Sequence, residues 1–260
     1  MSILDELAAY AKERTRENKA RVSLQAMRDM AEKMPNGGFV FEKQLAKDGM
    51  SFICECKKAS PSKGIIAEEF PYLQIARDYE AAGADCISVL TEPKWFLGSD
   101  EYLKEISSAV KIPCLRKDFT VDEYMIYEAK TLGASAVLLI CSILSPAQLQ
   151  EYISVCDSLG LTAIVETHDE KEVFEAVVAK ARVIGVNNRN LKDFSVDTGN
   201  SANLRKLVPP NILFIAESGI KNADDVKALH SIGADAVLVG ETLMRAADKK
   251  AMLDELRSGL

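Results

Sequence analysis

The sequence predicts an α/β protein whose single domain is a (β/α)8 TIM barrel with an N-terminal helical extension. From residue 51 onward, eight short apolar segments alternate with amphipathic segments of helical period. A chain of 260 residues is long enough to close one such barrel. A helix end, a glycine and an apolar strand recur around Gly83, Gly133 and Gly233, at separations of 50 and 100 residues that match one and two pairs of βα units. An open, doubly wound sheet is the alternative.

The N-terminal segment is expected to be helical. Ser2 and Asp5 form a capping-box pattern at the start of one helix. Its apolar face would contain Ile3, Leu7 and Ala11. A second helix is expected to end at the Pro-Asn-Gly-Gly sequence of 35–38, where proline and glycine break the helical pattern. Its apolar residues are Leu24, Met27, Met30 and Met34.

The barrel strands are expected where apolar and β-branched residues form short runs. These runs are 51–57, 85–91, 113–119, 135–141, 162–167, 182–188, 212–218 and 235–240. Helical periodicity is clear between them at 71–83, 122–133, 145–160 and 222–233. We therefore divide the single domain, 1–260, into an extension, 1–48, and a barrel, 49–260.

Composition and charge exclude several classes of protein. There are 32 basic and 39 acidic residues, and the net charge of −7 argues against a general binder of nucleic acid or of anionic membranes. The longest uninterrupted apolar run, 136–141, is far too short to span a bilayer, and the N-terminus lacks the pattern of a secretory signal peptide. The six cysteines lack zinc-site spacing, and no nucleotide-binding glycine motif is present. We expect a cytoplasmic protein with reduced core thiols, no metal and no cofactor.

Polar side chains end nearly every predicted strand, which is where a barrel of this kind carries its active site. Glu55 and Lys57 lie two residues apart, so both point to the same side of their strand. Burying such an ion pair is costly. The pair therefore suggests either binding of an anionic substrate or a proton-transfer partnership, and a structural salt bridge inside the barrel is the alternative.

Lys117 and Glu166 are a candidate acid and base. In its strand, Lys117 points away from the face that carries Arg116 and Asp118. A like charge nearby, such as Lys57, would lower the pKa of Lys117 and suit it to general-acid or Schiff-base chemistry. An exposed lysine that only packs its aliphatic stem is the alternative. Glu166 ends an apolar strand, where a carboxyl group either has a raised pKa or pairs with a lysine.

An anion site is expected in three loops that precede helices. The loops at 57–64, 218–220 and 239–242 supply small residues and, in the first, several lysines. Helix N-termini and the last two βα loops of a barrel bind phosphate readily. The only histidines, His168 and His230, form no visible triad or zinc site, and we expect both to be structural or exposed.

Seven motifs occur in order along these strands and loops. They are FICECKKASPSKG at 52–64, SVLTEPKWFLGS at 88–99, LRKDF at 115–119, IVET at 164–167, IGVNNRNL at 184–191, IAESGI at 215–220 and VLVGETLM at 237–244. Together they resemble the indole-3-glycerol phosphate synthase family over almost the whole chain. The resemblance implies an enzyme of tryptophan biosynthesis that closes the indole ring of 1-(2-carboxyphenylamino)-1-deoxyribulose 5-phosphate, with loss of carbon dioxide and water and without metal or cofactor.

The resemblance also implies roles for the strand-end residues. Lys117 would be the general acid that protonates the ketone oxygen. Lys57 would hold the substrate carboxylate and interact with Glu55, while Glu166 would act as the base or stabilise the cationic intermediate. Either lysine could protonate the hydroxyl that leaves during dehydration. Substrate-positioning residues would be Asn187, Ser218 and Glu217.

The remaining implied contacts are aromatic or lie at the phosphate. Phe96 and Phe119 would contact the anilino ring, with Trp95 as a further wall. A core anchor is the alternative for Trp95. The other substrate and phosphate contacts would be Ser60, Arg189, Gly219, Gly240 and Glu241. Trp95 stands where the family has Phe or Tyr, Ala59 where some members have a cation, and Glu241 where many have a small residue. The last two departures concern the phosphate contacts rather than the reaction.

Two other kinds of function fit parts of the pattern. One is another phosphate-binding barrel enzyme, such as phosphoribosylanthranilate isomerase or an aldolase that forms a Schiff base on Lys57 or Lys117. The other is a barrel without catalysis that serves as an assembly module, with the charged N-terminal helices as its partner surface. For the catalytic reading we expect a phosphorylated small-molecule substrate and a monomer, with other enzymes of tryptophan biosynthesis as the protein partners to consider, and neither nucleic acid nor membrane.

Overall fold

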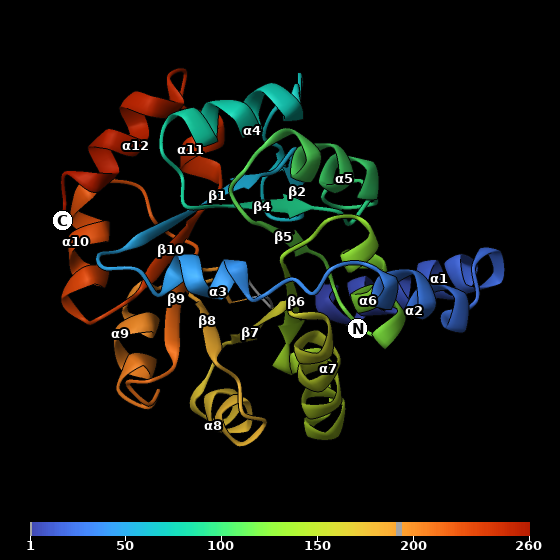
Figure 1. Ribbon diagram of the computed structural model, residues 1–260. Coiled ribbons are helices and arrows are strands. Elements are labelled where there is room, and N and C mark those ends of the chain that lie inside the picture. The colour runs from blue at the N-terminus through green and yellow to red at the C-terminus, as the bar shows by residue number, and fades with distance from the viewer. Residues whose placement is uncertain (1, 191–193) are drawn as a thin grey trace.

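Eight parallel strands close into a barrel in a computed structural model that describes residues 2–190 and 194–260 (Figure 1). The order around the barrel is β1-β10-β9-β8-β7-β6-β5-β4. The strands are β1 Ser51–Cys56, β4 Cys86–Leu90, β5 Cys114–Lys117, β6 Ala136–Ile140, β7 Thr162–Thr167, β8 Val183–Asn187, β9 Leu213–Glu217 and β10 Ala236–Val239. The eight predicted strands are confirmed, and closure excludes the open sheet. Leu191, the last residue of one motif, lies outside the described residues.

Helices surround the barrel, as the alternating sequence pattern predicts. They are α4 Tyr72–Ala81, α5 Asp100–Ala109, α6 Glu123–Thr131, α7 Pro146–Leu159, α8 Glu170–Val178, α9 Gly199–Arg205, α10 Ala223–Ser231 and α12 Lys249–Arg257. Shorter elements are the hairpin of β2 Ala59–Ser60 and β3 Gly64–Ile65, the 3-10 turn η1 Cys141–Ile143 and α11 Glu241–Arg245. The predicted helices correspond to α4, α6, α7 and α10.

The N-terminal segment forms three helices, α1 Ile3–Arg21, α2 Leu24–Lys33 and α3 Val40–Leu45. Of these, α1 and α3 lie at opposite ends of the barrel, and α2 packs against α6. The capping box between Ser2 and Asp5 is present at the start of α1. At the amino ends of the strands, α3 donates from the Glu42 N–H to Thr162 at the start of β7. The chain thus closes one end of the barrel with α3 and leaves α1 for the other end. The division at residue 48 stays a prediction.

The strand side chains alternate between two apolar cores. Ile53, Leu115, Ile164 and Ile215 belong to the cluster inside the barrel, whereas Cys54, Val137 and Val165 belong to the cluster between strands and helices. Because direction alternates along a strand, the residues two positions after each of the four inward residues also point inward. Those residues are Glu55, Lys117, Glu166 and Glu217. The alternation of side-chain direction along the strands therefore places both the inner apolar core and these four charged groups inside the barrel.

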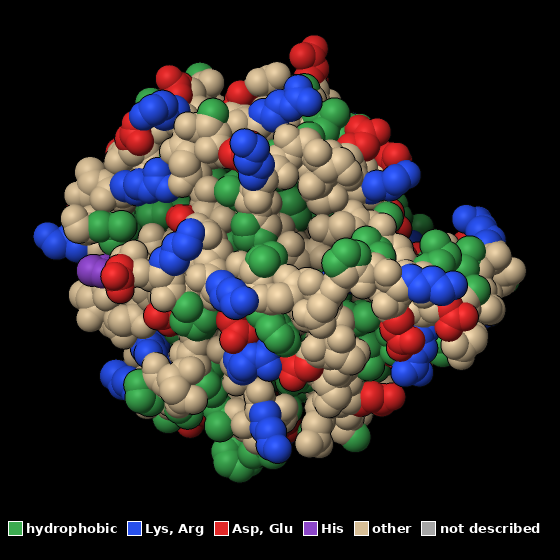
Figure 2. Space-filling model, in the orientation of Figure 1, with side chains coloured by type: hydrophobic (Ala, Val, Ile, Leu, Met, Phe, Trp, Pro, Cys, Tyr) green, Lys and Arg blue, Asp and Glu red, His purple; other side chains and the backbone are tan. Residues whose placement is uncertain are grey.

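Among the described residues, no helix is both long enough and apolar enough to cross a bilayer. On the face seen in Figure 2, acidic and basic side chains are interspersed rather than gathered by sign. The six cysteines are free thiols, and all of them are buried.

Candidate active site

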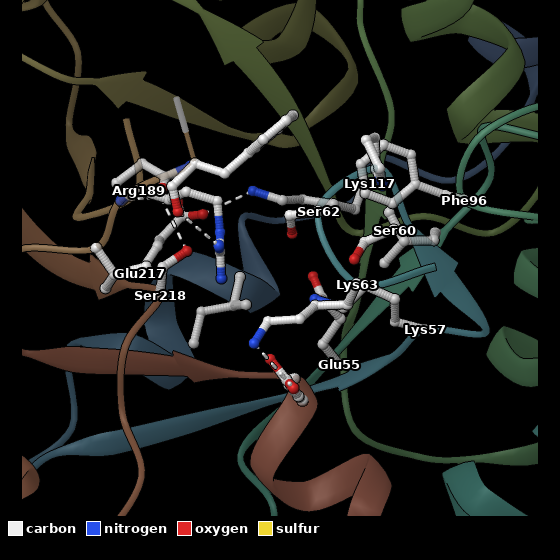
Figure 3. A pocket seen from close by; sticks show the side chains of 18 of the residues that line it. Glu55, Lys57, Ser60, Ser62, Lys63, Phe96, Lys117, Arg189, Glu217 and Ser218 are labelled. Carbon is white, nitrogen blue, oxygen red and sulfur yellow. Dashed lines mark hydrogen bonds and ion pairs between the residues drawn. The ribbon is translucent and has the colours of Figure 1, made fainter. Parts of the chain in front are cut away.

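A cavity of about 630 Å³ opens at the carboxyl ends of the strands. Figure 3 shows side chains from several strands and loops converging on it. Fourteen of the residues expected at the site line this one cavity: Glu55, Lys57, Ser60, Phe96, Lys117, Phe119, Glu166, Asn187, Arg189, Glu217, Ser218, Gly219, Gly240 and Glu241. Residues separated by up to 186 positions in the sequence (55 to 241) therefore meet in one place.

Lys117 lies between two carboxylates at the floor of the cavity. Its Nζ is 2.6 Å from Oε2 of Glu217 and 3.0 Å from Oε2 of Glu166. Burial lowers the pKa of Lys117, but attraction to Glu166, Glu217 and Glu55 outweighs burial, so the pKa is raised. The expectation of a lowered pKa is therefore wrong: carboxylates, rather than Lys57, dominate the surroundings of the ammonium group. Lys117 is a retained cation, which suits a proton donor better than a nucleophile.

Glu166 and Glu217 both bond to Lys117, but their pKa values are shifted in opposite directions. Burial raises the pKa of Glu166, yet Lys117 and His168 outweigh it and the net pKa is lowered. Burial also raises the pKa of Glu217, Lys117 opposes this, and the proximity of Glu166 helps to keep the net pKa raised. Of the two predicted alternatives for Glu166, pairing with a lysine is therefore confirmed. Environments that separate the pKa values of two neighbouring carboxyl groups are typical of acid–base sites.

Strand register and one glycine make room for this cluster. Glu166 of β7 is paired with Gly185 of β8, and Asn187 of β8 with Glu217 of β9. A Cβ atom on Gly185 would lie 2.4 Å from Oε1 of Glu217, so only glycine leaves that carboxylate its present position. Asn187 donates to Oε1 of Glu166 at 3.3 Å and accepts from the Ser218 hydroxyl at 2.9 Å. Asn187 and Ser218 are thus tied to the candidate base.

Glu55 and Lys57 form the predicted ion pair on the opposite wall. Glu55 is almost fully buried, and Lys57 is partly exposed to the cavity. A Cβ atom on Gly240 would lie 2.4 Å from Oε1 of Glu55 and 2.8 Å from Nζ of Lys57. Gly240 therefore leaves space for the pair. A partly exposed ammonium beside a buried carboxylate can turn toward a substrate carboxylate, which a permanently enclosed salt bridge could not do.

The mouth of the cavity combines small residues with cations. Ser60 and Gly219 line it, and Gly219 has φ +87°, a left-handed conformation that favours glycine. Glu241 is 3.5 Å from the Lys63 ammonium and 3.1 Å from the Arg245 guanidinium. These cations neutralise the carboxylate that departs from the family pattern, and Lys63 reaches across the mouth in Figure 3.

The aromatic wall contains two of the three expected rings. Phe96 and Phe119 line the cavity, with ring centroids 6.0 Å apart. Trp95 is missing from the described residues of the lining, so the expectation that it forms a wall is wrong. Its ring makes an edge-to-face contact with Tyr10 of α1, at a centroid distance of 5.6 Å, and Lys94 lies over both rings. Trp95 therefore anchors α1 to the barrel instead of facing the substrate.

A buried carboxylate fixes the loop that carries Phe96. Glu92 is fully buried and accepts from the backbone N–H groups of Lys94, Trp95 and Phe96 at 2.8–2.9 Å. Three such bonds hold the loop in one shape. The sequence placed Glu92 at a strand end but gave no indication of this role, because backbone partners leave no residue pattern.

Two further contributions come from outside the fourteen residues, and for the N-terminal extension the family resemblance already implies a place over the mouth of the site. The start of α1 supplies Ile3, Leu4 and Leu7 to the cavity lining. His168, expected to be structural or exposed, instead lies 3.3 Å from Glu166. A signal for His168 was available, because it follows Glu166 by two residues, the spacing that pairs Glu55 with Lys57. Among residues 2–190 and 194–260, no group of three or more His, Cys, Asp or Glu side chains could hold a metal ion.

The fold and the site define an acid–base enzyme of the (β/α)8 class, with an ammonium group among carboxylates on the floor of its cavity and small residues and cations at the mouth. The model of the indole-3-glycerol phosphate synthase family matches residues 4–256, and the chain belongs to that family. It is a carboxy-lyase of tryptophan biosynthesis that closes the indole ring.

Individual relatives agree with the family assignment. The chain is 56% identical to the indole-3-glycerol phosphate synthase of Ruminiclostridium cellulolyticum and 52% identical to that of Leuconostoc mesenteroides, in each case over 98% of both chains. Among solved structures, 3-hexulose-6-phosphate synthase is similar with a TM-score of 0.67 and 16% identity, over 81% of this chain and all of that one. Thiamine phosphate pyrophosphorylase from Pyrococcus furiosus has a TM-score of 0.62 and 18% identity, over 84% and 96%. These two similarities concern the fold alone.

Proposed function

We propose that Lys117 is the general acid of the ring closure and that Glu166 is its base. The observation that carries this proposal is the position of the Lys117 ammonium, bonded to two buried carboxylates and still facing the cavity. A lysine with a raised pKa keeps its proton at neutral pH. It gives the proton up only to an oxygen that becomes strongly basic, as a ketone oxygen does when a carbon nucleophile attacks the carbonyl carbon.

The steps balance with a net uptake of one proton from water, because the substrate oxygen receives two protons and Glu166 takes one back. The aromatic carbon that bears the carboxylate attacks the ketone carbon, and the ketone oxygen takes the proton of Lys117. The bond to the carboxylate then breaks, carbon dioxide leaves, and its bonding electrons restore the aromatic ring. The new hydroxyl leaves as water after protonation by Lys57, or by Lys117 once water has returned a proton to it. Glu166 takes the proton from the neighbouring ring carbon, which completes the indole.

The binding roles follow from the two ends of the cavity. Lys57 would hold the substrate carboxylate while Glu55 neutralises the lysine between turnovers. Ser60, Gly219 and Gly240 would surround the phosphate at the mouth, with Arg189 and Glu241 beside it, and Phe96 and Phe119 would pack against the anilino ring. Asn187, Ser218 and Glu217 would orient the substrate against the acid and the base.

The experiment is the appearance of indole fluorescence when the purified protein meets 1-(2-carboxyphenylamino)-1-deoxyribulose 5-phosphate. We expect signal from the unsubstituted protein and a loss of about 10²- to 10⁴-fold in Lys117→Ala. Lys171→Ala is the matched control, because Lys171 is 82% exposed on α8, and it should keep full activity. Full turnover in folded Lys117→Ala would contradict the proposed acid.

The aldolase alternative has its own test. Borohydride traps a Schiff base covalently, whereas an acid–base lysine leaves no adduct. The raised pKa of Lys117 speaks against a nucleophilic amine. We expect no mass increase on treatment with borohydride and substrate, and a reduced adduct on Lys117 or Lys57 would favour the aldolase.

We also propose that the protein is a monomer and acts in the cytoplasm. Six free, buried thiols support a reducing compartment. Size-exclusion chromatography with light scattering should give the mass of a single chain, 28.5 kDa. A mass near twice that value would contradict the monomer.

A further inference from the structure

His168 lies beside the active site, between two carboxylates. Its Nε2 atom is 3.3 Å from Oε1 of Glu166, and its Nδ1 atom is 3.0 Å from Oε2 of Glu172. The side chain is 17% exposed, so water screens these contacts only in part. Glu166 lies near the end of β7, and His168 directly follows the last residue of that strand. Because the two are two residues apart, their side chains point to the same side. Each ring nitrogen of His168 therefore faces a negative charge.

Two carboxylates on opposite nitrogens favour the doubly protonated ring. A neutral imidazole carries a proton on one nitrogen only, whereas an imidazolium carries one on both. Nδ1 is hydrogen-bonded to Glu172, while the contact of Nε2 with Glu166 is an ion pair without hydrogen-bond geometry. Burial lowers the pKa of His168, but contacts with Glu166 and Glu172 outweigh burial and raise the pKa to about 10. The ring is therefore a cation at neutral pH.

The ring is held by several elements. Glu172 of α8 also accepts the backbone N–H of His168 at 2.7 Å, and the hydroxyl of Ser142 in η1 lies 3.4 Å from Nδ1. The neighbouring Asp169 caps α8 through the N–H of Glu172. Among the described residues, the charged groups that face the ring are thus Glu166 from β7 and Glu172 from α8. Because the backbone N–H of His168 donates to Glu172, replacing the imidazole ring leaves this backbone bond in place.

A second cation lies within ion-pair distance of Glu166. Lys117 bonds to Oε2 of Glu166 and also to Glu217, so one ammonium serves two carboxylates. The other oxygen of Glu166, Oε1, receives the amide of Asn187 at 3.3 Å and lies 3.3 Å from His168. Of these two partners of Oε1, only His168 carries a charge.

We propose that His168 is a positioning residue for the ring closure: as an imidazolium held by Glu172, it keeps Glu166 ionised and fixes the carboxylate oxygen that Lys117 does not bond. The inference rests on the role proposed for Glu166. His168 itself exchanges no proton with the substrate in this account and acts only through Glu166.

The test is the pH profile of kcat/KM for His168→Gln, with His230→Gln as the matched control on the exposed side of α10. Glutamine keeps an amide donor but removes the charge. We expect the acid limb to move to higher pH by about one unit, the usual effect of one close opposite charge. The loss should therefore be about tenfold larger on the acid limb than at pH 8. His230→Gln should follow the unsubstituted protein, and the substrate's own ionisation cancels because all variants meet the same substrate.

A double variant separates this inference from the proposed function. His168→Gln added to Glu166→Gln should cause no further loss, because the charge then has no carboxylate to act on. If Glu166→Gln is inactive and the second substitution still multiplies the loss, His168 acts elsewhere and the inference is wrong. If Glu166→Gln turns over normally, both the base and its positioning residue are wrong.

A direct measurement of the ring completes the test. Nitrogen-15 NMR of the two imidazoles, assigned by the signals that His168→Gln removes, should give a doubly protonated His168 at pH 7.5. Glu172→Gln should shift the titration of that ring to lower pH. A neutral His168 ring at pH 7.5 would overturn the inference, because a neutral ring cannot hold Glu166 ionised.

Discussion

Arg116 and Lys117 are neighbours in β5, and both are cations surrounded by carboxylates, yet they face opposite sides of the strand. Arg116 is 2% exposed and lies between barrel and helices, where it bonds to Asp100 at 2.7 Å, to Glu128 at 2.8 Å and to the carbonyl of Met125 at 2.9 Å. Lys117 faces the cavity. Arginine suits the first position because its fork satisfies several acceptors at once and retains its charge.

Arg116 uses its charge to stabilise the structure, whereas Lys117 presents its charge to the cavity. The donors of Arg116 are directed at fixed partners that a substrate cannot reach. The compact ammonium of Lys117 is bonded to Glu166 and Glu217 and still borders the cavity. A buried cation alone therefore does not identify a catalytic residue. What distinguishes Lys117 is the direction of its side chain, which the alternation of the strand determines.

The largest expected effect lies on the cavity side. Glu166→Gln removes the candidate base but keeps the shape of the side chain and its bond with Asn187. We expect kcat to fall by about 10²- to 10⁴-fold, with little change in the unfolding midpoint. Steady-state assays of indole fluorescence, with circular dichroism on the same samples, measure both quantities. A folded variant within a few-fold of full turnover would remove Glu166 from the mechanism.

The opposite pattern is expected on the helix side. Arg116→Met leaves Asp100 and Glu128 without their shared cation, whereas Asp118 keeps its ion pair with Arg14. The free energy of unfolding should fall by about 3–5 kcal/mol. The folded fraction should keep turnover of the same order, because Arg116 does not line the cavity. Urea unfolding and activity per folded molecule provide the check. Unchanged stability with lost activity would reverse the comparison.

A smaller effect is expected at Gly240, which lies against the ion pair of Glu55 and Lys57. Gly240→Ala places a methyl group against both Glu55 and Lys57, so the pair must separate. We expect KM to rise about tenfold, which corresponds to the loss of one hydrogen bond between the substrate and a charged group. Gly199→Ala is the control, because its added Cβ would meet only the Asp197 side chain, at 3.0 Å, on the surface. Equal KM values for the two variants would separate the ion pair from substrate binding.

The smallest effect concerns stability and pH. Because the pKa of His168 is raised to about 10 from an ordinary 6.5, its charge stabilises the folded state fully below pH 6.5 and progressively less as pH rises toward 10. The unfolding free energy of His168→Gln should therefore lie below that of the unsubstituted protein at pH 6.5, and the gap should close by pH 10. A gap that stays constant or widens with rising pH would show that the ring contributes by packing.

The fold and the cavity lining could be predicted because they depend on repeated local patterns. Eight apolar runs gave the strands, and the alternation within each run sent Glu55, Lys117 and Glu166 inward together. What failed depended on the neighbours that folding supplies. The raised pKa of Lys117 follows from Glu166 together with Glu217, which is 100 residues away in sequence. Trp95 packs against Tyr10. No spacing pattern in the sequence indicates the contact of Lys117 with Glu217 or that of Trp95 with Tyr10.

The central claim is that Lys117 donates a proton rather than only a charge, and Lys117→Arg tests it most directly. Arginine keeps the positive charge beside Glu166 and Glu217 but, because its pKa lies well above that of lysine, does not give up its proton readily. We predict that Lys117→Arg folds and that its kcat is as low as that of Lys117→Ala. Turnover of Lys117→Arg within tenfold of the unsubstituted protein would contradict the account and assign Lys117 a purely electrostatic role.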